Sequence, residues 1–163
     1  MNGHENSGFS LLELVIVVVI IGIIAAIAVP RLSRGSVGAA DAALIRDLDI
    51  MRAAIDLYAA EHGGTRPGAD VVNQLTQYTD ALGAVSATKD VTHIYGPYLR
   101  RIPPMPVGQK KGATAFYIET NANGLPEDGG DDQAWWYNTK TGDLQANLKD
   151  ADVDASGKPY NTY

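Results

Sequence analysis

The chain has 163 residues, a formal net charge of −6 at pH 7 and no cysteine. This length most naturally makes one modest domain with a single core. The acidic balance speaks against a nucleic-acid partner, which would favour a basic face. The lack of cysteine excludes a disulfide framework and a thiolate metal site. Much of the apolar content lies between Phe9 and Val29, and the chain after Pro30 reads as soluble protein.

A membrane-length apolar segment follows a short polar leader, residues 1–8. Phe9 to Val29 comprises 21 residues, and a helix of that length rises roughly 30 Å, the thickness of a bilayer core. Glu13 is the only ionisable side chain in the segment. Because a carboxylate inside a membrane segment is costly, it usually has a partner.

Three interpretations of the segment are open. It is a plain signal anchor, or it is a secretory signal peptide cut after Ala28, at the A-x-A-like sequence Ala26-Ile27-Ala28. The second interpretation would release a soluble binding or enzymatic domain. In the third, the chain is cut after Gly8, and Phe9 carries a new α-amino group four residues before Glu13. Attraction between this amine and the carboxylate of a neighbouring helix would set the axial register of the two helices.

The sequence Gly8-Phe9-Ser10-Leu11-Leu12-Glu13, followed by an apolar helix, resembles the processing site of type IV pilins and pseudopilins. The resemblance implies cleavage by a prepilin peptidase after Gly8 and N-methylation of Phe9. It also implies a single pass through the bacterial inner membrane, with the head in the periplasm. Copies of the chain would assemble, with other pilins or pseudopilins and an inner-membrane assembly platform, into a helical filament.

Two further features bear on this resemblance. Pro30 falls where these proteins often carry a helix-disturbing proline. The leader differs from the family pattern, because it contains no Lys or Arg, whereas Arg31 and Arg34 flank the far end of the apolar run. The positive-inside rule alone would therefore favour the opposite orientation to the one that the family requires.

A second helical pattern covers residues 30–62, the predicted stalk helix. Apolar residues recur on one face, at Val37, Leu44, Leu48, Met51, Ile55 and Tyr58. The pair Gly63-Gly64 predicts that the helix ends near His62. We expect the apolar face to pack against the chain's own head, residues 63–148.

The first part of the head contains a weaker helical pattern in Pro67–Gly83 and then a loop rich in proline and glycine. We expect this loop to be buried through four anchors, Tyr95, Tyr98, Leu99 and Ile102. Its Tyr-Leu pair and proline-rich turn resemble the segment by which major pseudopilins of type II secretion enter their sheet. The sequence Met105-Pro106-Val107-Gly108 stands where those proteins usually have Asp-Pro-Trp-Gly.

Strands are predicted at Thr114–Thr120 and Ala134–Tyr137, where β-favouring residues are dense. Residues 138–142 form the predicted turn of a hairpin, and 143–148 its returning strand. These elements predict an α+β fold, in which a long N-terminal helix packs on a small antiparallel sheet. The first half of the helix is predicted to be transmembrane and the second half amphipathic. Residues 149–163 are predicted to be a polar, partly disordered tail.

The sequence contains no catalytic constellation, so we expect a structural protein and not an enzyme. Its one candidate site is the acidic segment Asn121–Asp132, whose oxygen-rich side chains would suit Ca²⁺. The candidate ligands are Glu127, Asp128, Asp131 and Asp132. Major pseudopilins bind calcium in a loop before their last strands, so the resemblance supports the site; the alternative is a solvated turn of like charges.

The leading hypothesis is therefore a pseudopilin of a type II secretion system. The Tyr-Leu and proline segment, the acidic segment and the absence of cysteine favour it. The alternative within the same family is a type IV pilin for adhesion, motility or DNA uptake, and only the last role would involve nucleic acid. Many such pilins carry a C-terminal disulfide, which this chain cannot form.

Overall fold

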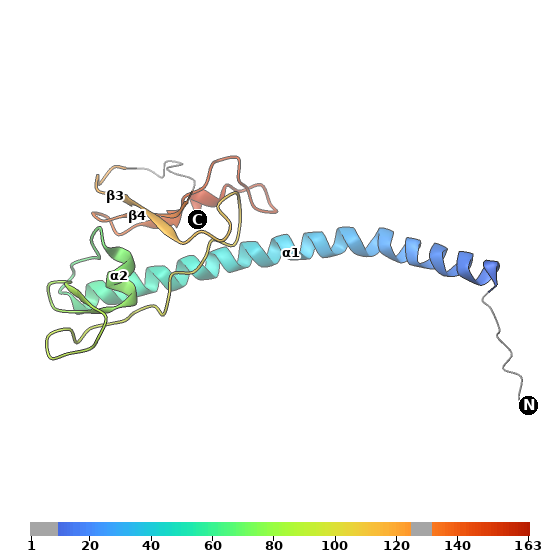
Figure 1. Ribbon diagram of the computed structural model, residues 1–163. Helices are drawn as coiled ribbons and strands as arrows, with labels where there is room; N and C mark the ends of the chain where they lie inside the picture. Colours follow the sequence, from blue (N-terminus) through green and yellow to red (C-terminus); the bar gives the residue numbers. More distant parts are fainter. Residues whose placement is uncertain (1–9, 125–131) are drawn as a thin grey trace, which may run out of the picture. The chain divides into compact units, whose positions relative to one another are not determined.

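The computed structural model describes residues 10–124 and 132–163, and it describes the side chains of all of these except 28–35. The chain divides into two compact units, Met1–Val37 and Gly38–Tyr163 (Figure 1). One helix, α1, covers Leu11–Glu61 and so contributes to both units.

In the first unit, the apolar side chains of α1 from Leu11 to Ile27 are exposed. The backbone stays helical through Pro30. No helix in the described part of the chain combines the length and the apolarity that crossing a membrane requires. The transmembrane half of the helix therefore stays a prediction.

In the second unit, α1 buries the predicted apolar face. Leu44, Leu48, Met51, Ile55 and Tyr58 are each at most 2% exposed. This confirms the amphipathic pattern from Leu44 onward, although Val37, the first residue of the predicted stripe, is exposed.

The end of α1 also agrees with the sequence. Gly63 adopts φ +63°, and the Gly64 N–H donates to the carbonyl of Ala59 at 2.7 Å. A left-handed glycine and a bond of this span are the usual way to close a helix. The helix ends at Glu61, one residue before the predicted end.

The helical pattern of Pro67–Gly83 is realised only in part. The helix α2 is Val71–Thr76, and the chain then forms two short antiparallel strands, β1 at Tyr78–Thr79 and β2 at Val85–Ser86. Asp80 explains the difference, because its Oδ1 accepts the N–H groups of Leu82 and Ala84. An aspartate that binds the following amides favours a turn over a helix.

The main sheet contains β3 (Ala115–Glu119), β4 (Gln133–Asn138) and β5 (Leu144–Ala146), in that order. The antiparallel β4–β5 hairpin is confirmed, with Tyr137 opposite Leu144. The prediction of an antiparallel sheet is wrong for β3, which runs parallel to β4 with Phe116 opposite Trp135. The long connection between the two strands permits this return crossing, and strand propensity alone does not fix a direction.

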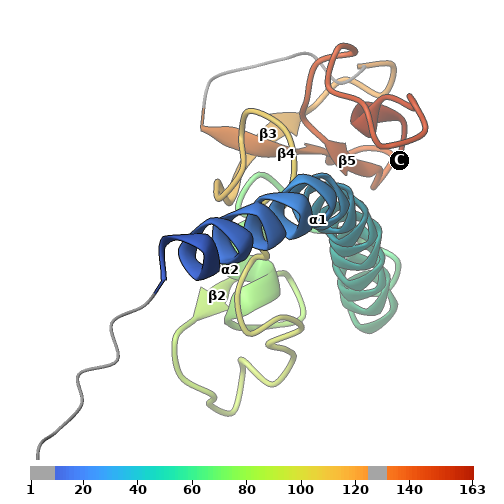
Figure 2. The same ribbon diagram turned by 90° about the vertical axis from the view of Figure 1, so that its right-hand side faces the viewer.

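The core lies between this sheet and α1, which confirms the α+β class. Figure 2 shows β3–β5 on one side of α1, and α2 with β2 on the other. Trp135 and Tyr137 are fully buried, and each donates to a proline carbonyl, of Pro103 at 3.1 Å and of Pro67 at 2.9 Å.

The proline-rich loop is anchored as predicted at two of its four positions. Leu99 and Ile102 are buried in the core, whereas Tyr95 and Tyr98 are half-buried. The Tyr98 hydroxyl donates to Oε2 of Glu61 at 2.6 Å and so links the loop to the end of α1.

The predicted tail, residues 149–163, is polar in composition, and it contains regular structure. Val153 and Pro159 form an antiparallel bridge, and Tyr160–Thr162 is a short 3-10 helix, η1. Tyr160 is only 6% exposed. Buried Tyr160 anchors this segment in the core, and a polar composition does not reveal such an anchor.

Candidate processing and assembly site

The start of α1 is built by two side chains that bind backbone amides. Oε2 of Glu13 accepts the N–H of Ser10 at 2.9 Å, and Oγ of Ser10 accepts the N–H of Leu12 at 3.3 Å. Ser10 and Glu13 thus satisfy amides at the N-terminus that have no partner within the helix. This reciprocal arrangement is a capping box.

The carboxylate of Glu13 therefore caps the start of its own helix, in addition to the expected pairing with an amine of a neighbouring helix. It lies in the first turn, where the positive end of the helix dipole favours an anion. The signal was present in the sequence, because Ser10-Leu11-Leu12-Glu13 has the S-x-x-E spacing of a capping box. Sequence reasoning considered the cost of Glu13 in a membrane and its attraction to an amine at Phe9, and it missed this role.

The other residues of the predicted processing site cannot be placed in the same way. Gly8 and Phe9 lie outside the described residues. Pro30 belongs to α1, and its side chain is not described.

Of the four candidate calcium ligands, only Asp132 lies among the described residues, and it is exposed just before β4. Glu127, Asp128 and Asp131 lie outside them. Among the residues that are described, no group of three or more acidic, histidine or cysteine side chains could hold a metal ion. A lysine lies next to this position in the fold. Lys110 is 7% exposed, and its ammonium N–H donates to the carbonyl of Gln133, the residue after Asp132, at 3.1 Å.

The two described histidines bind within their own surroundings. His62 is buried and stacks on Tyr58, with 3.8 Å between ring centroids. Its Nδ1 lies 2.8 Å from the Tyr58 carbonyl oxygen and its Nε2 lies 2.9 Å from that of Asp80. Nδ1 of His93 lies 2.8 Å from Oδ2 of Asp90.

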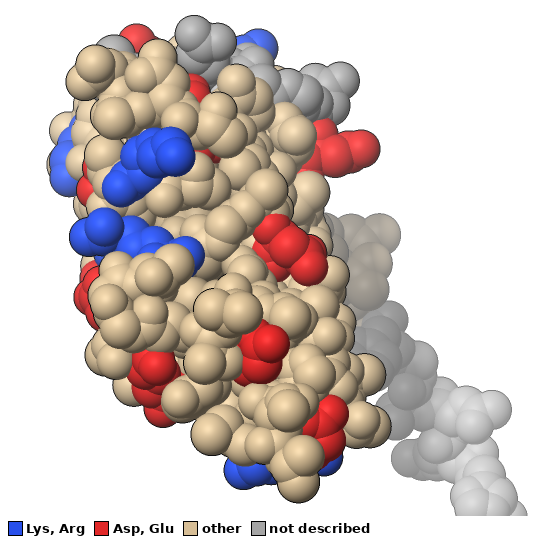
Figure 3. All heavy atoms as spheres, turned by 90° about the vertical axis from the view of Figure 1, so that its left-hand side faces the viewer, with Lys and Arg blue, Asp and Glu red and all other residues tan. Residues whose placement is uncertain are grey.

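Two surface depressions lie on the second unit. One, of about 400 Å³, is lined by residues of mixed charge, Arg52, Asp56, Arg66, Thr141, Gly142, Asp143, Leu144 and Gln145. The other, of about 520 Å³, is lined by Arg46, Asp47, Arg101, Pro103, Pro104, Met105, Pro106, Lys111 and Gly112. Figure 3 shows the face of this unit that lies on the left in Figure 1: most of its surface is uncharged, with both basic and acidic side chains scattered over it.

Comparison with known proteins bears on the N-terminal segment. Residues 4–29 match the family model described as the prokaryotic N-terminal methylation motif. No curated protein and no solved structure matches the chain. The matched residues include Gly8, Phe9 and the capped start of α1 at Ser10 and Glu13. The chain therefore carries the N-terminal methylation motif of type IV pilin-like proteins.

Proposed function

We propose that the chain is a structural, non-enzymatic subunit of a type IV filament-like assembly, most similar to a pseudopilin of a type II secretion system. The match of residues 4–29 to the methylation motif carries this proposal. In it, a prepilin peptidase cuts after Gly8, Phe9 is N-methylated, and the first part of α1 is a single pass through the inner membrane. The head, in the periplasm, is then the exposed part of each subunit.

Polymerisation would use the N-terminal part of α1. The side chains of Leu11 to Ile27 are exposed over a continuous stretch, and exposed apolar surface of this extent needs either lipid or other protein to cover it. Copies of the same helix, other pilins or pseudopilins, and the assembly platform of the inner membrane are the partners that fit. Glu13 would then lie one turn from the methylated amine of Phe9.

The pseudopilin branch is supported by features of the head. The proline-rich loop contributes Leu99, Ile102 and Met105 to the core, as a segment that leads into the sheet would. The absence of cysteine disfavours a surface pilin closed by a C-terminal disulfide. A type IV pilin for adhesion, motility or DNA uptake is the second candidate function, and it shares the same processing and the same N-terminal helix.

Calcium binding by the acidic segment is a separate proposal. Ca²⁺ takes six to eight oxygen ligands, and Asp132 is the only candidate carboxylate among the described residues. The site would therefore depend on Glu127, Asp128 and Asp131. The bound ion would neutralise like charges and fasten the connection between β3 and β4.

The deciding experiment is the intact mass and N-terminal sequence of the chain from the host's membrane fraction. We expect a chain that begins at N-methylated Phe9. A chain that begins at Val29 in the soluble fraction would instead make it a secreted domain, and an uncut chain would make it a simple anchor. Loss of protein secretion on deletion of the gene, with pili intact, would then separate the pseudopilin from the surface pilin.

A further inference from the structure

The segment of residues 80–94, here called the arm, presents two large apolar side chains almost entirely to solvent. Leu82 is 93% exposed and Val91 is 95% exposed. Leu82 lies in a fixed turn, because Oδ1 of Asp80 accepts the N–H of Leu82 at 2.8 Å and that of Ala84 at 2.9 Å. The hydrogen bond from Ala84 also lowers the pKa of the Asp80 carboxyl, which is therefore an anion at neutral pH.

Val91 is held in the same manner. Oδ1 of Asp90 accepts the N–H groups of His93 and Thr92, both at 2.8 Å. These hydrogen bonds, above all the one from the His93 N–H, hold the pKa of Asp90 well below its usual range. The arm thus presents two apolar tips, each beside a carboxylate, in turns that are already ordered. A surface ordered before binding loses less entropy when a partner docks.

The second depression has the complementary chemistry. Its apolar lining includes Met105 and three prolines, and its charged lining residues are Arg46, Arg101, Lys111 and Asp47. Arg46 pairs with Asp47 at 3.2 Å. Arg101 and Lys111 form no ion pair with any described residue. A lining that combines apolar side chains with unpaired cations suits an apolar side chain flanked by a carboxylate.

The other depression fits the arm less well. The guanidinium of Arg52 already donates to the carbonyl of Leu144, at 2.7 Å from Nη2. The charged lining residues of this depression are two arginines, Arg52 and Arg66, and two aspartates, Asp56 and Asp143, so it has no net positive charge to attract the carboxylates of the arm. Charge therefore selects the depression around Arg101 and Lys111.

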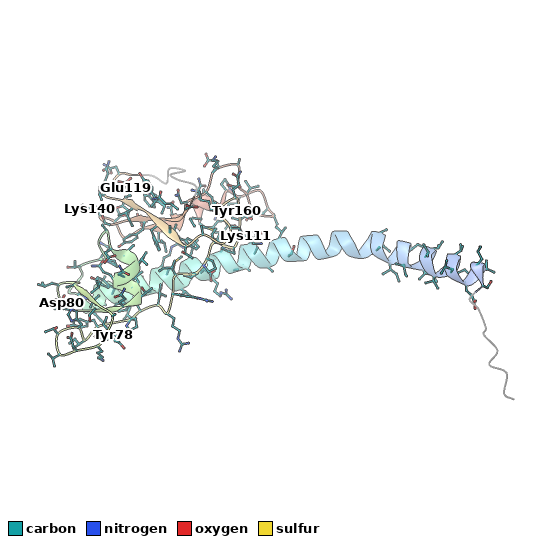
Figure 4. The ribbon with its side chains drawn as sticks, viewed as in Figure 1. Tyr78, Asp80, Lys111, Glu119, Lys140 and Tyr160 are labelled. Carbon is teal, nitrogen blue, oxygen red and sulfur yellow. The ribbon has the colours of Figure 1, made fainter. Side chains whose placement is uncertain are left out.

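The arm cannot reach that depression in its own chain. The Asp80 carbonyl lies against His62, just after the end of α1. Arg46, which lines the depression, is 16 positions before His62 in the chain. Along a helix this is roughly 24 Å. Figure 4 shows Asp80 at the end of α1 and Lys111 well back from it. Two different, mutually complementary surfaces on one chain are what an open helical assembly requires.

We propose that the arm of one subunit docks into the depression around Arg101 and Lys111 of the next copy of this chain. Leu82 and Val91 then pack on Met105 and the prolines, and Asp80 and Asp90 face the cations. This inference rests on the proposed filament function and names the contact between successive heads.

The cysteine-free chain allows a direct test. The full chain carrying Val91→Cys and Lys111→Cys, expressed with its assembly system and oxidised, is expected to give a ladder of disulfide-linked multimers. The matched control carries Val91→Cys and Asp143→Cys, at the other depression, and is expected to give none. Processed chains that form filaments but give no ladder, or an equal ladder in the control, would overturn the docking contact alone. Absence of processing and of filaments would overturn the proposed function, and this inference with it.

Charge reversal gives an independent readout. We expect Arg101→Glu, in the same cysteine background, to lower the cross-linked fraction at least about tenfold, since a close like-charge contact costs more than 1.4 kcal/mol. Arg100→Glu reverses the adjacent exposed arginine, which does not line the depression, and should leave the fraction unchanged. Equal effects of the two reversals would show that only net charge matters and would overturn the contact.

Discussion

Tyr160 donates its hydroxyl proton to Oδ1 of Asp41, across 119 positions of the chain and over 2.6 Å. Oδ2 of the same aspartate accepts the N–H of Ala155 at 3.2 Å. One carboxylate on α1 thus binds the last segment of the chain at two points. Because Tyr160 is also buried, this contact joins a polar tail to the core of the head.

Replacing Tyr160 by Phe should destabilise the head. The variant keeps the buried ring but leaves Asp41 without its hydroxyl donor, and a hydrogen bond to a charged group contributes roughly 1.5–3 kcal/mol. We expect a loss of about 1–2 kcal/mol, because Asp41 is only partly buried. Urea unfolding of the full chain in detergent, followed by the fluorescence of Trp135 and Trp136, measures it. Tyr117→Phe, at a half-buried tyrosine of β3, is the control and should stay within about 0.5 kcal/mol of the parent.

Stability should fall at high pH because of buried tyrosines. Burial is the largest of the effects that raise the pKa of Tyr98, Tyr137 and Tyr160 above the ordinary tyrosine value. A neutral hydroxyl is therefore favoured in the folded chain, and its contribution is complete below the unfolded pKa of about 10 and is lost as pH rises above it. The free energy of unfolding, measured from about pH 8 to about pH 11, should decline above pH 10. The decline should be shallower in Tyr160→Phe, and identical slopes would contradict the assignment.

Gly83 is a position where a methyl group has no room. It adopts φ +84°, and a Cβ there would overlap the hydroxyl of Tyr58 and lie 3.0 Å from Nε2 of Gln74. Gly112 has a similar φ of +92° with nothing within 4 Å of the added atom. Gly112→Ala should therefore cost only the conformational penalty of about 1–2 kcal/mol.

Gly83→Ala adds an overlap to that penalty and should cost about 3 kcal/mol or more in the same unfolding assay. Tyr58→Phe removes the hydroxyl that the added methyl group would overlap. Tyr58→Phe should therefore cost less stability in the Gly83→Ala background than in the parent chain. Equal costs for the two glycine variants would show that the site relaxes freely.

Sequence periodicity predicted the elements whose apolar residues face one core. The stripe from Leu44 to Tyr58 and the hairpin around Asn138–Gly142 are both present, because each depends on local spacing and on turn residues. The direction of β3 could not be predicted, since pairing depends on how the following connection returns. The fold of the tail was missed because it depends on Tyr160 and Asp41, which only the folded chain brings together.

The candidate site shows a related difference. The residues Gly8 to Glu13 indicated the processing motif, which the family comparison supports. The hydrogen bonds of Ser10 and Glu13 add a local role that the S-x-x-E spacing already contained. By contrast, the docking surfaces combine residues 80–94 with residues 46, 101 and 111, and no linear pattern connects them.

Calcium should stabilise the head if the acidic segment binds it. We expect chelation to lower the melting temperature of the full chain and added calcium to restore it, because the ion would offset repulsion among Glu127, Asp128, Asp131 and Asp132. Asp131→Asn should weaken the response, whereas Asp150→Asn, in the tail, should preserve it. Melting curves that are superimposable with and without calcium would identify the segment as a solvated turn.

The two roles of Glu13 can be separated by one matched pair of variants. Glu13→Ala removes both the charge and the acceptor for the Ser10 N–H, whereas Glu13→Gln removes the charge and keeps an acceptor that suits a capping box. Loss of the cap alone costs about 0.5–2 kcal/mol and frays the first turn.

If the carboxylate pairs with the amine of Phe9 on a neighbouring helix, both variants should be processed after Gly8 and both should assemble poorly. Filament yield and helical order, measured by electron microscopy, are the readouts, with cleavage followed by mass spectrometry. Normal filaments from Glu13→Gln, alongside defective ones from Glu13→Ala, would assign Glu13 to the cap and remove the charge-pairing mechanism. The neutral amide is decisive because it preserves the observed local geometry and removes only the charge.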